Sequence, residues 1–154
     1  MSSAAAQTAI SYQRTFPGRA DQVGLVRRDI ASYLAGHRAA DDAVLIASEL
    51  AANSVLHSAS ADEHFTVRCQ ACPGQVRIEV EDLGGPWHPG QPDSRPHGLD
   101  LITALTGPDG WGAETTSQGN RIVWALLDQS SSWRPGCTQG LLSSPFGLEA
   151  GPRG

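Results

Sequence analysis

The chain has 154 residues and a net charge of −5, which fits one domain and excludes two full ones. Apolar residues make up 40% of it, so it can build a hydrophobic core and is not disordered as a whole. All 11 basic residues are arginine, and the 16 acidic residues outnumber them, so we expect no direct nucleic-acid binding through an extended positive face.

The N-terminal half alternates between strand and helix signals. Alternating apolar and polar residues over 8–16 predict a strand, which Pro17 and Gly18 end. Apolar residues at helical spacing predict one helix from Asp21 to Leu34 and a second over 40–57. Residues 64–71 and 75–82 alternate around a Pro-Gly turn and predict a hairpin.

The C-terminal half begins with a long segment over 83–97 that holds four of the ten prolines, which is typical of a functional loop. After it, 98–105 predicts a short helix, and 111–116 and 121–127 predict two strands. This order places helices in one layer and antiparallel hairpins in another, an α+β sandwich. We assign 8–128 to this domain and 129–154, half of it Ser, Gly or Pro, to a flexible tail.

Targeting and thiol signals are few. The first twelve residues lack the features of a secretory signal, and no apolar run approaches the roughly 18 residues that span a bilayer. Three cysteines, an odd number, do not form a disulfide framework. We therefore expect a cytoplasmic protein with reduced thiols and no membrane contact.

A polar stripe interrupts the apolar helix predicted over 40–57. Glu49, Asn53 and His57 are spaced by four residues, each offset by about 40° from the last, so the three share one side of the helix. A buried carboxylate and amide without partners would cost several kcal/mol, so these groups must face each other, solvent or a ligand. The alternative is that the stripe is simply the edge of the helix that faces solvent, which would require no functional role.

Three further short motifs are each compatible with ordinary turns and helix starts. Asp82-Leu-Gly84 ends a predicted strand, Gly98-Leu99 opens a predicted helix, and Gly119 precedes the last strand.

Taken in order, these motifs resemble the N, G1, G2 and G3 boxes of the GHKL (histidine-kinase-like) ATP-binding family, and most of all its small serine-kinase anti-sigma-factor branch in actinomycetes. The matching residues are Glu49-Leu-Ala-Ala-Asn53, Asp82-Leu-Gly84, His97-Gly98-Leu99 and Gly119. The resemblance covers about 8–128 and implies a two-layer sandwich with a mixed, mostly antiparallel sheet and three helices on one face.

The resemblance also implies roles at the phosphate end of the nucleotide. Asn53 would ligate the Mg²⁺ that bridges the phosphates of ATP, since an amide oxygen is a hard neutral ligand. Glu49 would be the general base for the attacking hydroxyl. The 85–97 segment would be the ATP lid, carrying Arg95 and His97, and the helix that starts at Gly98 and Leu99 would direct N–H groups at the phosphates.

At the base end, the resemblance implies that Asp82 accepts a hydrogen bond from the exocyclic amine of adenine. Gly84 would let the backbone approach the base, and Gly119 would belong to the last box.

Two residues depart from the family. Pro96, which has no N–H to donate, replaces a glycine of the G2 box, and Ile122 takes the place of a threonine near the adenine.

Two functions follow from the resemblance. In the first, the chain is an ATP-dependent serine/threonine kinase that phosphorylates an anti-sigma-factor antagonist and regulates transcription by controlling a sigma factor. In the second, it is a non-catalytic module that regulates a partner with a degenerate ATP site. The carboxylate of Glu49 favours the first and Pro96 the second. Small members of this branch are often homodimers.

A zinc site at Cys69-x-x-Cys72 is a third hypothesis, from a different class. A single such pair without a second is a weak signal. His64 precedes Cys69 by five residues on a predicted strand, so alternation puts the two on opposite faces, roughly 17 Å apart. The alternative is that Cys69 is an ordinary strand residue and Cys72 an ordinary turn residue, without a metal.

Overall fold

The structure is a computed structural model that describes residues 10–85 and 98–129. Five strands form one sheet in the order β1-β2-β3-β5-β4, and every pairing between them is antiparallel. The strands are β1 (Ile10–Pro17), β2 (His64–Cys72), β3 (Gln75–Asp82), β4 (Trp111–Thr115) and β5 (Arg121–Asp128).

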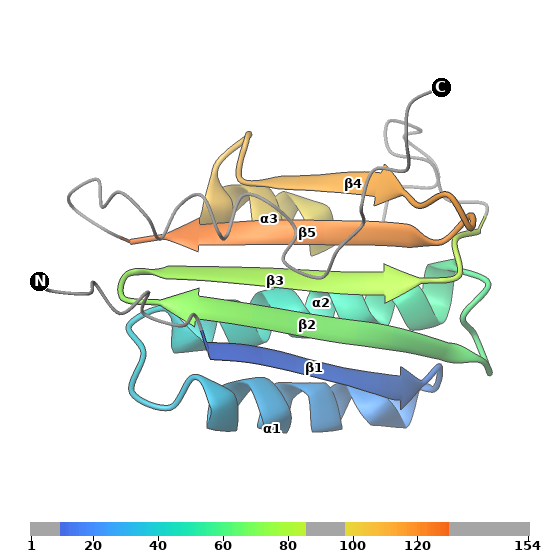
Figure 1. Cartoon of the computed structure of the whole chain (residues 1–154), viewed down its shortest axis with the longest axis horizontal. Helices are drawn as coiled ribbons and strands as arrows, with labels where there is room; N and C mark the ends of the chain where they lie inside the picture. The colour runs from blue at the N-terminus through green and yellow to red at the C-terminus, as the bar shows by residue number, and fades with distance from the viewer. Residues whose placement is uncertain (1–9, 86–97, 130–154) are drawn as a thin grey trace, which may run out of the picture.

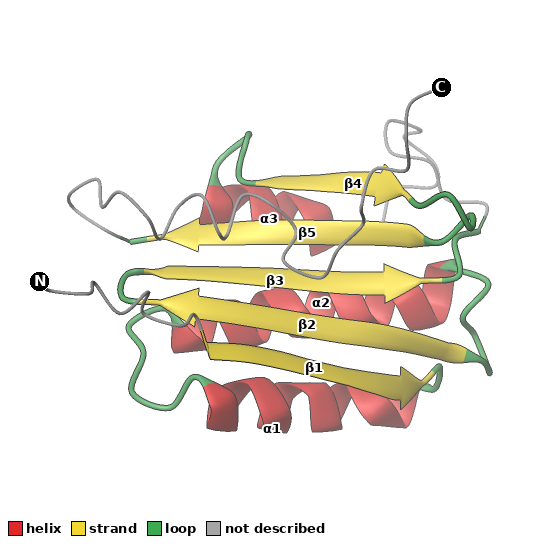
Figure 2. Ribbon diagram, in the orientation of Figure 1, coloured by secondary structure: helices red, strands yellow, loops and turns green. Residues whose placement is uncertain are grey.

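All three α-helices lie on one face of this sheet, behind it in Figure 1. A short 3₁₀ turn, η1 (Ala20–Gln22), leads into α1 (Val23–Tyr33), which is followed by α2 (Ala40–His57) and α3 (Gly98–Thr106). Figure 2 shows the resulting two layers, one of strands and one of helices. Among the described helices, none combines the length and the apolar run that a bilayer crossing requires.

The predicted α+β sandwich is therefore confirmed. The helix over 40–57 and the strand over 75–82 have the predicted bounds, because their periods of 3.6 and 2 are clear in the sequence. The sheet is purely antiparallel in the described residues, where a mixed sheet was expected. Except for Gly85 and Gln129, the predicted lid over 85–97 and the predicted tail over 129–154 lie outside the described residues.

The core lies between the two layers. Alternate residues of each strand face the helices, so the aromatic rings of Phe16 and Phe65 stack there at 5.6 Å between centroids. Ile46 of α2 and Ile78 of β3 are fully buried in the same cluster. This packing fixes α2 against the middle of the sheet, and α2 is the helix that carries the polar stripe.

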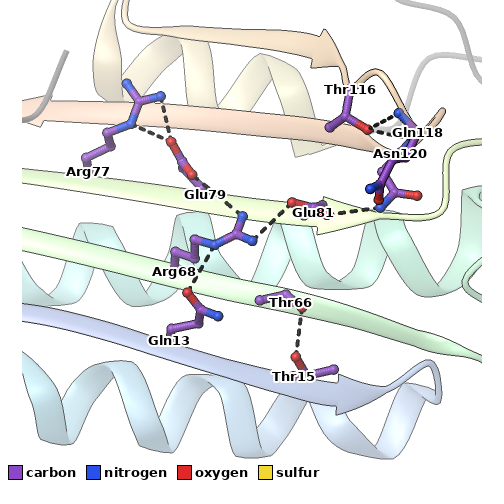
Figure 3. A network of polar contacts seen from close by, with 10 residues as sticks. All are labelled: Gln13, Thr15, Thr66, Arg68, Arg77, Glu79, Glu81, Thr116, Gln118 and Asn120. Carbon is purple, nitrogen blue, oxygen red and sulfur yellow. Dashed lines mark hydrogen bonds and ion pairs between the residues drawn. The ribbon is translucent and has the colours of Figure 1, made fainter. Parts of the chain in front are cut away.

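The opposite face of the sheet carries a polar network, drawn in Figure 3. Arg77 and Glu79, alternate residues of β3, form an ion pair at 2.8 Å and are both buried. Arg68 of the neighbouring strand pairs with Glu81 at 3.0 Å. Each of these charges on β3 therefore has an opposite charge beside it, as buried charges require.

Candidate functional site

The polar stripe of α2 is present in the folded chain. Glu49 and Asn53 are both half-buried, and neither forms a hydrogen bond or ion pair with another described residue. The residues around them, Ser48, Leu50 and Ser54, are buried. A carboxylate and an amide one turn apart, partly shielded and not paired within the described chain, are available to a ligand. The side chain of His57 is not among those that the structure describes.

Asp82 ends β3 on the helix-facing side of the sheet and is buried. Its Oδ1 accepts a hydrogen bond from the backbone N–H of Gly84 at 2.8 Å. Its Oδ2 accepts from the Ser54 hydroxyl at 2.8 Å and from the Arg121 guanidinium at 2.9 Å. Ser54 follows Asn53 in α2, so this hydrogen bond ties the helix that carries the polar stripe to Asp82.

Gly84 and Gly119 meet although they are far apart in the sequence. Gly84 has φ +75°, and a Cβ added to it would lie 2.8 Å from the carbonyl oxygen of Gly119. Gly119 also has a positive φ, +83°, in the turn between β4 and β5. Both positions therefore favour glycine, and the first of them also requires it for space.

The segment after α2 holds the segment after β3 in place. The backbone N–H of Leu83 donates to the Ser60 hydroxyl at 2.8 Å, and the N–H of Ala59 donates to the carbonyl of Gly84 at 2.6 Å. Gly85 lies against the backbone of Ser58, where an added Cβ would be 2.9 Å from its Cα. These contacts fix the position of Gly84 relative to α2.

Helix α3 begins at Gly98 and packs against α2 and β5. Leu99 is buried in the hydrophobic core, so its side chain stabilises the fold and only its backbone is available to a ligand. Two predicted site residues, Arg95 and His97, lie outside the described residues, as does Pro96.

Two site residues were missed by the sequence analysis, Ser54 and Arg121. Ile122 was expected near the adenine end. In the register between β3 and β5, however, Ile122 lies opposite Glu81, whereas Arg121 lies opposite Asp82. Because strand residues alternate between faces, Arg121 shares the face of Asp82 and Ile122 points away. An arginine at the start of an otherwise apolar strand was the signal in the sequence.

The residues present fit a magnesium nucleotide. In the described residues no group of three or more His, Cys, Asp or Glu side chains could hold a metal ion by itself. Mg²⁺ is commonly bound through one or two protein oxygens together with substrate phosphates, and the Asn53 amide supplies such an oxygen. A metal at this site would therefore depend on the nucleotide for its other ligands.

The cysteine pair does not form a metal site in this geometry. Cys69 faces the helices, and Cys72, three residues on in the same strand, faces the other side. Burial raises the pKa of the Cys69 thiol, which disfavours the thiolate that would bind a metal. Cys69 is a free thiol, as expected, whereas Cys72 is in a disulfide, contrary to the expectation that all thiols are reduced.

Comparisons with known proteins agree with this fold. The family described as histidine kinase-like ATPase domain matches residues 16–114. A crystal structure of the RsbU and RsbW domains of Rv1364c from Mycobacterium tuberculosis has a similar fold, with a TM-score of 0.60 and 22% identity. The match covers 81% of this chain and 34% of that one, so this chain spans about a third of its length. No curated protein matches the sequence.

Proposed function

The chain belongs to the histidine kinase-like ATPase family, and on that premise we propose that it binds ATP with Mg²⁺ between α2, Asp82 and the Gly84–Gly119 contact. We further propose that it transfers the terminal phosphoryl group to a serine or threonine of an anti-sigma-factor antagonist. The substrate and the reaction come from the resemblance of its motifs to the anti-sigma-factor kinase branch.

The observation that carries the proposal is the stripe on α2. Glu49 and Asn53 are half-buried without partners in the described chain, on a helix that otherwise packs into the core. The next residue after Asn53, Ser54, is hydrogen-bonded to Asp82. One helix therefore presents groups suited to phosphates and metal and also touches the carboxylate suited to a base.

Each residue has a role that follows from its chemistry. When bound, ATP supplies the phosphoryl group and Mg²⁺ neutralises its oxygens. Asn53 offers an amide oxygen to the metal, and Glu49 accepts the proton of the attacking hydroxyl. The N–H groups at the start of α3, from Gly98 onward, are directed to anions, since the first turn of a helix leaves them without helical partners.

We also propose the biological setting that the resemblance implies. The chain would bind a sigma factor when its antagonist is absent, act in the cytoplasm, and form a homodimer. Arg95 and His97 would contact the phosphates from the lid, and Gly119 would border the base. The domain would span 8–128, with 129–154 as its tail.

A titration of the purified chain with ATP, with and without Mg²⁺, tests the proposal. Asn53→Ala should abolish Mg²⁺-dependent binding. Glu49→Gln should bind ATP as the wild type does but transfer no phosphate to an antagonist protein. Asp41→Asn, which neutralises an exposed carboxylate in the first turn of the same helix, is the matched control and should change neither. Absence of wild-type binding at millimolar ATP would refute the proposal.

A second candidate is the non-catalytic module, and one observation favours it. The carboxylate of Asp82, which the family uses for the base, already accepts hydrogen bonds from Arg121, Ser54 and Gly84. Binding of ATP by the wild type without any phosphate transfer that depends on Glu49 would select this candidate.

A further inference from the structure

The ion pair between Arg121 and Asp82 occupies an acceptor position on Oδ2 of the carboxylate that would bind adenine. A carboxylate oxygen accepts about two hydrogen bonds. Oδ2 of Asp82 already has two donors, the Ser54 hydroxyl at 2.8 Å and a guanidinium nitrogen of Arg121 at 2.9 Å. Oδ1 has one, the N–H of Gly84 at 2.8 Å.

The guanidinium is a stronger partner than the base would be. Both donors would meet the same ionised carboxylate, but the adenine amine is neutral, whereas the guanidinium of Arg121 adds the attraction of a full positive charge. Both members of the pair are buried, with side chains 8% and 2% exposed, so water screens the attraction little. A base that approaches Oδ2 of Asp82 must therefore compete with a well-formed internal pair.

We propose that Arg121 is an internal competitor for the base-binding carboxylate, so that Oδ2 of Asp82 is open to a nucleotide base only after Arg121 has released it. The inference deepens the proposed function and rests on it, because it assumes that the nucleotide base reaches Asp82. Arg121 then lowers the affinity for ATP by the free energy of the contact that must be broken.

The position of Arg121 suits such a movement. It is the first residue of β5, directly after the turn that contains Gly119, so its side chain leaves the sheet at a strand end and not from the middle. Its alternate neighbour on the same face, Val123, is held in the core. Release of Arg121 therefore requires a change of side-chain rotamer, without any change in the strand register.

The test compares ATP affinity, with Mg²⁺, in the wild type and in Arg121→Ser. Loss of the competitor should tighten binding about tenfold or more, the affinity that one charge-assisted hydrogen bond is worth. Arg77→Ser is the matched control, because Arg77 also forms a buried ion pair on β3, with Glu79, but on the opposite face of the sheet. It should leave ATP affinity within about twofold of the wild type.

The outcomes separate this inference from the proposed function. If Arg121→Ser binds no more tightly while the wild type binds and Asn53→Ala does not, the competition is refuted and the proposed function stands. If neither the wild type nor Arg121→Ser binds, both fail. If only Arg121→Ser binds, the competition is supported and the chain is assigned to the non-catalytic candidate. Wild-type binding of GTP that Arg121→Ser abolishes would make Arg121 a base ligand and refute the competition.

Removal of Arg121 also leaves a buried charge on Asp82 and can unfold the chain. Circular dichroism of each variant reports whether it is folded. Arg121→Gln keeps a neutral amide donor in place of the guanidinium and is the second variant. It should give a smaller gain in ATP affinity than Arg121→Ser. No gain in a folded Arg121→Gln would refute the competition if Arg121→Ser does not fold.

Discussion

Replacement of Gly84 by alanine is the sharpest test of how the site is assembled. Gly84 follows Asp82 at the end of β3, and its backbone N–H hydrogen-bonds the Asp82 carboxylate. Its φ of +75° is one that alanine rarely adopts, and an added Cβ would lie 2.8 Å from the carbonyl oxygen of Gly119. The substitution therefore introduces backbone strain and a steric clash at one position.

The two costs can be estimated separately. A left-handed conformation costs a non-glycine residue roughly 1–2 kcal/mol. Forcing an extra carbon against well-placed atoms costs about 1–3 kcal/mol more, and here the obstacle is backbone that cannot rotate away. We expect Gly84→Ala to lower the free energy of unfolding by about 2–5 kcal/mol, out of the roughly 5–15 kcal/mol typical of a domain.

Urea unfolding followed by circular dichroism measures this change, and Gly36→Ala is the matched control. Gly36 has a similar φ of +83°, but nothing lies within 4 Å of its added Cβ, so this variant reports the strain alone. The free energy of unfolding of Gly36→Ala should be lower than that of the wild type by about 1 kcal/mol. Equal losses in the two variants would refute the close approach of Gly84 to Gly119.

Two further predictions concern the fold. Burial opposes the charge of Asp29, but hydrogen bonds from Tyr12 and Arg14 outweigh it and lower the pKa of that carboxyl. Its stabilisation is therefore present above the unfolded pKa of about 3.9 and is lost as the pH falls through the lower folded value. Asp29→Asn should cost about 1 kcal/mol at pH 7, and urea midpoints should show this cost shrinking near pH 3; an undiminished cost would contradict the assignment. Phe65→Ala, which empties a fully buried site, should lower the free energy of unfolding by about 3–5 kcal/mol in the same assay. Leu56→Ala, at a position that is 69% exposed, should change it by no more than about 0.5 kcal/mol. Similar losses in the two variants would contradict the assigned core.

Local periodicity explains why the elements could be predicted. The bounds of α2 and β3 were predicted correctly because apolar residues recur every three to four positions in one and every second position in the other. The same reasoning found Glu49 and Asn53, since polar residues at a spacing of four stand out on an apolar helix. Leu99 shows the limit of reasoning from local motifs, because a residue of a binding motif can have its side chain in the core.

The sequence by itself determined the elements, the polar stripe on α2 and the resemblance to the family, because each depends on residues close together in the chain. The tertiary structure alone decided which residue faces Asp82. Arg121 lies 39 positions away, and only the register between β3 and β5 selects it over Ile122. A shift of one residue in that register would exchange the two faces of the strand, so no local pattern could have identified the pair.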